Sequence, residues 1–83
     1  MNLSNKIGLN KEEILKKVGS KIKEIRTSKG LSQIELTTRM ELSTDPNNIS
    51  RLEAGRNNLT IFTLARIAKA LDVPMKDLID VEI

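Results

Sequence analysis

Apolar residues recur along the chain every three or four positions, which is the spacing of one face of an α-helix. The first stripe comprises Ile14, Val18, Ile22 and Ile25. A second stripe near the C-terminus comprises Leu64, Ile67, Ala68 and Leu71. No segment has the pattern of a β-strand, so the sequence predicts an all-α fold.

Capping residues predict where these helices begin and end. Asn10 and Ser32 each precede a glutamate by three positions, which is the spacing of a capping box. Gly30 is expected to end the first helix, although the pair Gly19-Ser20 could kink it or mark the start of its packed part. Three further helices are expected at 46–54, from a cap at Thr60, and from Pro74 through Ile79. The prediction is a compact five-helix bundle.

The segment Leu31–Gly55 predicts two short helices joined by a polar turn. The second helix begins with a capping Asp45 and with Pro46 at its first position. Ile49 and Leu52 should face inward. The opposite face should carry Asn47, Ser50, Arg51 and Ala54. Because Asn and Arg pair bidentately with base edges in the major groove, this pattern predicts a helix-turn-helix that binds DNA.

The composition narrows the class of protein. Eighty-three residues make one domain, which we assign to residues 10–83 after a flexible N-terminus at 1–9. The absence of cysteine and histidine excludes disulfides and thiolate or imidazole metal sites. Phe62 is the single aromatic residue, which disfavours recognition of single-stranded nucleic acid by base stacking. No metal, cofactor or small-molecule ligand is expected.

The charge is mildly basic, with a net value of +3. Residues 1–30 carry eight lysines and arginines against three glutamates, which suits a polyanion but also suits a solvated surface. No apolar run is long enough to span a membrane, and the polar start lacks a signal-peptide core. We therefore expect a soluble cytoplasmic protein.

Four segments in order, KIKEIRTSKG, LSQ, ISRLEAG and LTIFTLARIAKALDVP, resemble the Cro/phage-repressor, or XRE, family of helix-turn-helix regulators. The likeness extends from residue 19 to residue 79. It implies base contacts for Asn47, Asn48 and Arg51. It implies backbone contacts for Ser32, Gln33, Thr44, Arg56, Asn57, Asn58 and Thr60. It also implies a partly buried pair, Arg26 with Glu53, that joins the first and third predicted helices.

The chain departs from the family pattern in the turn that precedes Asp45. This turn is longer than usual, and we place the extra residues at Ser43 and Thr44. Glu41 stands where the family usually has glycine, and Thr37 replaces a small alanine. Pro46 occupies a common base-reading position without a donor or acceptor to offer. These departures bear on the angle of the third helix, not on the fold.

A second copy of the chain is expected as a partner, because one recognition helix covers only a few base pairs. Phe62 lies beside Ile61 and off the buried stripe, which suggests a partner surface. The alternative is that Phe62 fills a gap in the core. Leu78 and Ile79, with Val81 and Ile83 after them, could form a further contact between two copies.

The sequence thus predicts a homodimeric regulator that binds a two-fold related operator in double-stranded DNA. The segment RNNLTIFTLARIAKAL resembles restriction–modification controller proteins, which makes that role the favoured one. An operon-repressing antitoxin, a small phage repressor and a protein-interaction module remain alternatives. An enzyme is disfavoured, since the chain offers no nucleophile–base pair, Gly-rich phosphate loop or carboxylate dyad.

Overall fold

The computed structural model describes residues 10–40 and 46–83. Within these residues the chain forms helices and no strand, as the apolar spacing predicts. The five helices are α2 Lys11–Ser28, α3 Gln33–Arg39, α4 Pro46–Glu53, α5 Ile61–Leu71 and α6 Met75–Leu78. The expectations for residues 1–9, for Glu41 and for the cap at Asp45 lie outside the described residues.

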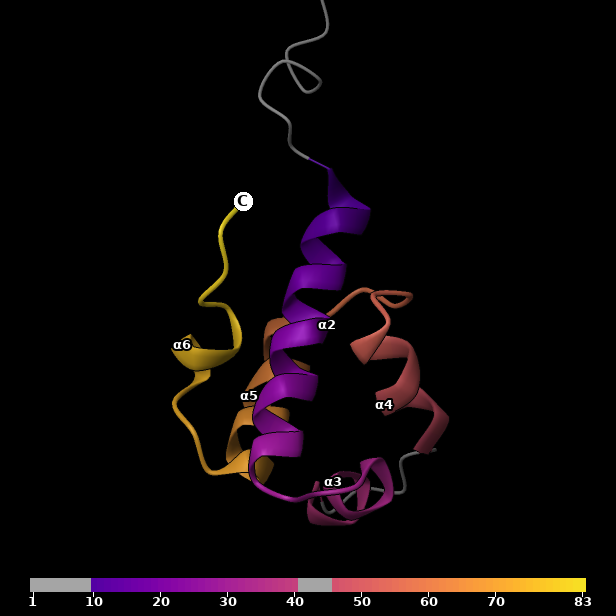
Figure 1. Cartoon of the computed structure of the whole chain (residues 1–83), viewed down its shortest axis with the longest axis vertical. Coiled ribbons are helices and arrows are strands. Elements are labelled where there is room, and N and C mark those ends of the chain that lie inside the picture. The colour runs from indigo at the N-terminus through magenta and orange to yellow at the C-terminus, as the bar shows by residue number, and fades with distance from the viewer. Residues whose placement is uncertain (1–9, 41–45) are drawn as a thin grey trace, which may run out of the picture.

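The longest helix, α2, runs through the middle of the bundle and organises the others around it (Figure 1). It packs against α4 on one side and α6 on the other, while α3 contacts both α4 and α5. Every described helix contributes at least one fully buried side chain to the core. These side chains are Ile22, Leu36, Ile49, Ile67, Leu71 and Leu78.

Three of the predicted helix starts are confirmed in atomic detail. The side chain of Asn10 accepts a hydrogen bond from the Glu13 backbone N–H at 3.1 Å. Ser32 forms a complete capping box, because it also donates its own backbone N–H to the Glu35 carboxylate at 3.1 Å. Thr60 accepts from the Thr63 N–H at 3.0 Å. Each bond satisfies a backbone donor that the first turn of a helix leaves unpaired.

The helix ends depend on residues in the left-handed region of backbone conformation. Gly30 and Gly55 have φ of 71° and 74°, as expected of glycines that terminate α2 and α4. Asp72 also adopts a positive φ, of 57°, at the end of α5. Short polar side chains such as aspartate tolerate this region better than bulky ones.

Gly19 does not kink α2, which is continuous from Lys11 to Ser28. It is buried where α2 crosses the end of α4. A Cβ atom at this position would lie 2.7 Å from the carbonyl oxygen of Glu53, and the carbonyl oxygen of Leu52 is nearer still. Gly19 therefore lets the backbones of α2 and α4 approach more closely than any other residue would allow.

The expectation that Leu78 presents its side chain to a second copy is wrong. Leu78 is 0% exposed and belongs to the core cluster of this chain. The single turn of α6 packs against α2 and α5, so its apolar residue is used within the bundle. Ile79, the next residue, remains 50% exposed.

None of the helices within residues 10–40 and 46–83 is both long and apolar enough to cross a bilayer.

Replacing Gly19 with alanine should destabilise the fold, because the added Cβ meets backbone atoms that cannot rotate away. We expect Gly19→Ala to lower the free energy of unfolding by about 1–3 kcal/mol or more, as overpacked cores do. Urea denaturation measures this difference. Ser20→Ala is the matched control, since Ser20 is exposed on the same helix and alanine favours helix there. Equal stability of the two variants would contradict the close-packing role of Gly19.

Candidate nucleic-acid interface

The outer face of α4 carries the residues that the sequence places there. Ile49 and Leu52 are buried in the core. The exposed positions at helical spacing are Asn47, Ser50, Arg51 and Ala54. The helix thus presents a polar strip with an amide in its first turn and a guanidinium in its last turn. We define Asn47, Ser50 and Arg51, together with Ala54 directly after the helix, as the outer face of α4.

Asn48 lies at the border of this face and is half-buried. The Nη1 atom of Arg51 donates a hydrogen bond to the Oδ1 atom of Asn48 at 3.1 Å. Residues three apart on a helix are neighbours, so the bond forms along α4 itself. It orients the Arg51 side chain toward the N-terminal part of the helix and leaves further guanidinium N–H groups available as donors.

A buried ion pair joins α4 to α2. The Nε atom of Arg26 donates to Glu53 Oε2 at 2.6 Å, and its Nη2 atom donates to Oε1 at 3.0 Å. Both residues are 7% exposed. Arg26 Nη1 also donates to the backbone oxygen of Leu31 at 2.7 Å, which fixes the connection between α2 and α3. The predicted structural pair is confirmed, with a bidentate geometry that suits guanidinium and carboxylate.

Gln33 adds α3 to the same cluster. Its Nε2 atom donates to Glu53 Oε1 at 3.0 Å, and the residue is half-buried at the first position of α3. The family likeness predicts a phosphate contact for Gln33, and the structure shows a contact with a carboxylate inside the protein. A glutamine amide carries two N–H donors and an acceptor, so one bond does not exhaust its capacity.

Ser32 and Glu35 hold the start of α3 in place. The Ser32 backbone N–H donates to the Glu35 carboxylate, and the Ser32 hydroxyl oxygen accepts from the Glu35 backbone N–H at 3.0 Å. The backbone bond from Ser32 is the main cause that lowers the pKa of the Glu35 carboxyl, followed by the Ser32 side chain. The carboxylate is therefore charged at neutral pH, and the capping box that positions Gln33 is fully formed there.

The loop between α4 and α5 supplies the other predicted backbone contacts. Arg56 and Asn58 are exposed, Asn57 is half-buried, and Thr60 uses its hydroxyl oxygen as the cap of α5. One shallow groove is lined by Asn48, Asn57 and Asn58. The structure thus brings a predicted base-reading residue together with two predicted backbone residues, whereas Thr44 lies outside the described residues.

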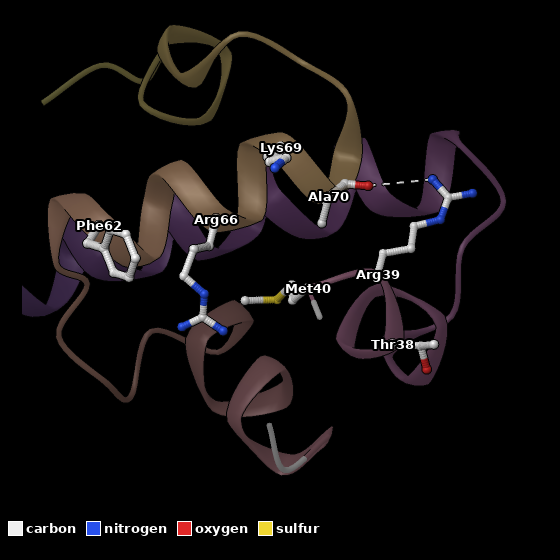
Figure 2. A pocket seen from close by; sticks show the side chains of 7 residues that line it. All are labelled: Thr38, Arg39, Met40, Phe62, Arg66, Lys69 and Ala70. Carbon is white, nitrogen blue, oxygen red and sulfur yellow. Dashed lines mark hydrogen bonds between the residues drawn. The ribbon is translucent and has the colours of Figure 1, made fainter. Parts of the chain in front are cut away.

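Arg66 lines the same groove, although it is not among the residues predicted from the sequence to contact DNA. Its guanidinium carbon lies 5.9 Å from the centroid of the Phe62 ring, one helical turn earlier on α5. Figure 2 shows the Arg66 side chain extending from α5 past Met40 toward α4. The spacing of four between an aromatic residue and an arginine is a signal in the sequence that could have identified this pair.

Phe62 does not fill a gap in the core. It is 70% exposed and Ile61 is 73% exposed, so the first turn of α5 presents an apolar surface. Phe62 borders a second groove between α3 and α5, which Figure 2 shows with Arg39, Arg66 and Lys69 around it. Arg39 Nη1 donates across this groove to the backbone oxygen of Ala70 at 3.5 Å.

Comparison with known proteins agrees with this arrangement. The helix-turn-helix family matches residues 22–78, which is most of the chain. The chain belongs to this family, in its XRE-type branch. Over 67 residues it is 39% identical to an uncharacterized HTH-type transcriptional regulator, y4dJ, from Sinorhizobium fredii, covering 81% of this chain and 84% of that protein. Family membership makes this chain a regulator, not an enzyme.

Two solved structures share the fold. The restriction–modification controller protein C.AhdI from Aeromonas hydrophila is 32% identical, with a TM-score of 0.71 over 80% of this chain and 96% of C.AhdI. The DNA-binding domain of BldD is 28% identical, with a TM-score of 0.73 over 81% of this chain and 94% of that domain. The helical arrangement in Figure 1 is therefore that of the family.

Removing one member of the buried pair should cost much more than removing both. Arg26→Met leaves the Glu53 carboxylate buried without its partner, and we expect a loss of about 3–5 kcal/mol in the free energy of unfolding. The double variant Arg26→Met/Glu53→Met should recover a large part of that loss. Urea denaturation of the wild-type protein, the two single variants Arg26→Met and Glu53→Met, and the double variant measures the coupling between the two residues. Lys23→Met, at an exposed position, is the control for loss of a charge from α2. Additive effects of the two substitutions would show that the pair is not coupled.

Proposed function

We propose that this protein is a sequence-specific regulator of transcription that binds double-stranded DNA as a homodimer. The observation that carries the proposal is the outer face of α4, where Asn47 and Arg51 are exposed on a helix that is fixed to α2 and α3 through Glu53. Held in this way, the face can enter the major groove as a rigid unit. Asparagine then suits adenine and arginine suits guanine.

Contacts with the DNA backbone would flank α4 on both sides. Ser32 and Gln33 lie at the start of α3, and Gln33 keeps donor capacity beyond its bond to Glu53. Arg56, Asn57 and Asn58 follow the C-terminal end of α4. These two sets of backbone contacts would fix the register of α4 in the groove, while the outer face of α4 would contact the bases.

The exposed pair Ile61 and Phe62 supports dimerisation through the start of α5. Adjacent apolar side chains that are each about 70% exposed mark a surface that benefits from being covered. A symmetric dimer presents the same patch twice and places its recognition helices one turn of DNA apart, about 34 Å. Such a dimer requires an operator with two-fold related half-sites.

Among regulators, a restriction–modification controller is the role that the comparisons favour. C.AhdI bears that description and aligns with the described helical bundle over four-fifths of this chain. A homodimeric regulator would respond to its own concentration through dimerisation, which suits control of an operon that includes its own gene. An antitoxin or a phage repressor would work by the same mechanism.

Selection from a random duplex library at physiological salt tests the proposal directly. We expect sequencing of the retained duplexes to reveal two related half-sites in inverted orientation. The variant Phe62→Ser, which removes the exposed ring, should retain the half-site sequence with weaker selection for the pair. Recovery of duplexes without any enriched sequence would refute sequence-specific binding and direct the search to a protein partner.

Arg51→Ala and Asn57→Ala should separate base reading from backbone contact. Losing a bidentate base contact costs about 1–3 kcal/mol at one position, so Arg51→Ala should lower the ratio of specific to nonspecific affinity. Asn57→Ala should weaken all duplexes alike. Fluorescence anisotropy with operator and scrambled duplexes measures both ratios. Uniform weakening by Arg51→Ala would assign this residue to the backbone instead.

A further inference from the structure

A groove beside the C-terminal end of α4 is formed jointly by α2 and the loop that follows α4. Its lining residues are Lys11, Glu12, Leu15, Lys16, Ala54, Gly55, Arg56 and Asn58. Ala54 is the last residue of the outer face of α4, so the groove continues the surface that we propose to read bases. Its volume is about 630 Å³, and it is open to solvent.

The two walls of this groove are held together by a glycine contact. A Cβ atom on Gly55 would lie 2.7 Å from the backbone nitrogen of Lys16, so the loop backbone packs directly against α2. The first turns of α2 are thereby fixed beside Arg56. In Figure 1 this loop passes next to the N-terminal half of α2.

The groove carries an excess of positive charge that α4 itself does not supply. Lys11, Lys16 and Arg56 are exposed cations, and Glu12 is the one acid among the lining residues. Lys11 and Lys16 precede residue 22, where the match to the family begins. The match to the family model therefore assigns no role to these two lysines, which lie where α2 extends past the end of α4.

We propose that Lys11 and Lys16, together with Arg56, bind phosphates of the DNA backbone outside the base pairs read by α4. The inference rests on the proposed function and extends its footprint. Continuity with Ala54 and the sign of the charge favour a nucleic-acid backbone. Leu15 is the only large apolar residue that lines the groove, and it is half-buried. The groove therefore offers little apolar surface to a protein partner.

Other lysines of α2 provide a matched control, because they lie elsewhere on the helix. Lys17 is one residue from Lys16, about 100° around the axis. Its Nζ atom donates to the backbone oxygen of Glu82 at 2.8 Å, on the side of the C-terminal segment. Lys21 is one turn after Lys17 and does not line the groove. Thus α2 offers two pairs of lysines with equal charge and different placement.

The experiment compares Lys11→Gln/Lys16→Gln with Lys17→Gln/Lys21→Gln, which remove the same charge. Affinity for a selected operator is measured by anisotropy between low and high salt. Each lost phosphate contact should reduce the slope of log K against log salt by about 1, so we expect a reduction of about 2 per protomer, and about 4 for a dimer on the full operator, for the first variant only. Its preferred base sequence should be unchanged. Thermal unfolding checks that both variants fold.

A second measurement uses the operator trimmed to its half-sites without flanking base pairs. The first variant and the wild-type protein should then bind with nearly equal slopes, because the flanking phosphates are gone. Equal slopes for the two double variants on the full operator would overturn the lysine assignment. Failure of the wild-type protein to prefer any duplex would instead overturn the proposed function, so the two failures are distinguishable.

Discussion

The bidentate pair between Arg26 and Glu53 is the interaction on which the recognition surface depends. It joins α2 to α4, and through Gln33 and the Leu31 carbonyl it also fixes the start of α3. A buried charge pair contributes little net stability, since desolvation offsets the attraction. Its directional bonds instead fix how α4 is oriented against α2 and α3. The orientation of the exposed face of α4 is therefore determined by two buried side chains, Arg26 and Glu53.

Most of the architecture follows from signals that act over a few residues. The caps at Asn10, Ser32 and Thr60 and the terminal Gly30 are local, because each one satisfies backbone groups within a single turn. The alternation that separates Ile49 from Arg51 is equally local. Such features can be read from a sequence because neighbouring residues already determine their energy. The Arg26–Glu53 pair spans distant residues, and it was predicted through family likeness.

The features that the sequence did not reveal depend on contacts between distant segments. Gly19 resembles a helix breaker until the carbonyls of residues 52 and 53 are seen beside it. Leu78 has the pattern of a partner surface, and its burial follows from how α6 folds back on α2 and α5. Arg66 of α5 lines one groove with Asn48 of α4 and Asn57 of the following loop, which the fold brings together. Each assignment needs the geometry of two helices at once.

The close approach at Gly19 has a consequence for the partner as well as for the protein. With backbone packed on backbone, α4 has little freedom to tilt or roll against α2 when it meets a surface of slightly different shape. Any adjustment between the two molecules then falls to the duplex. Under the proposed function, the energy needed to bend or narrow the DNA would vary with base pairs that no side chain touches, so the stiffness of the operator would be part of what is recognised.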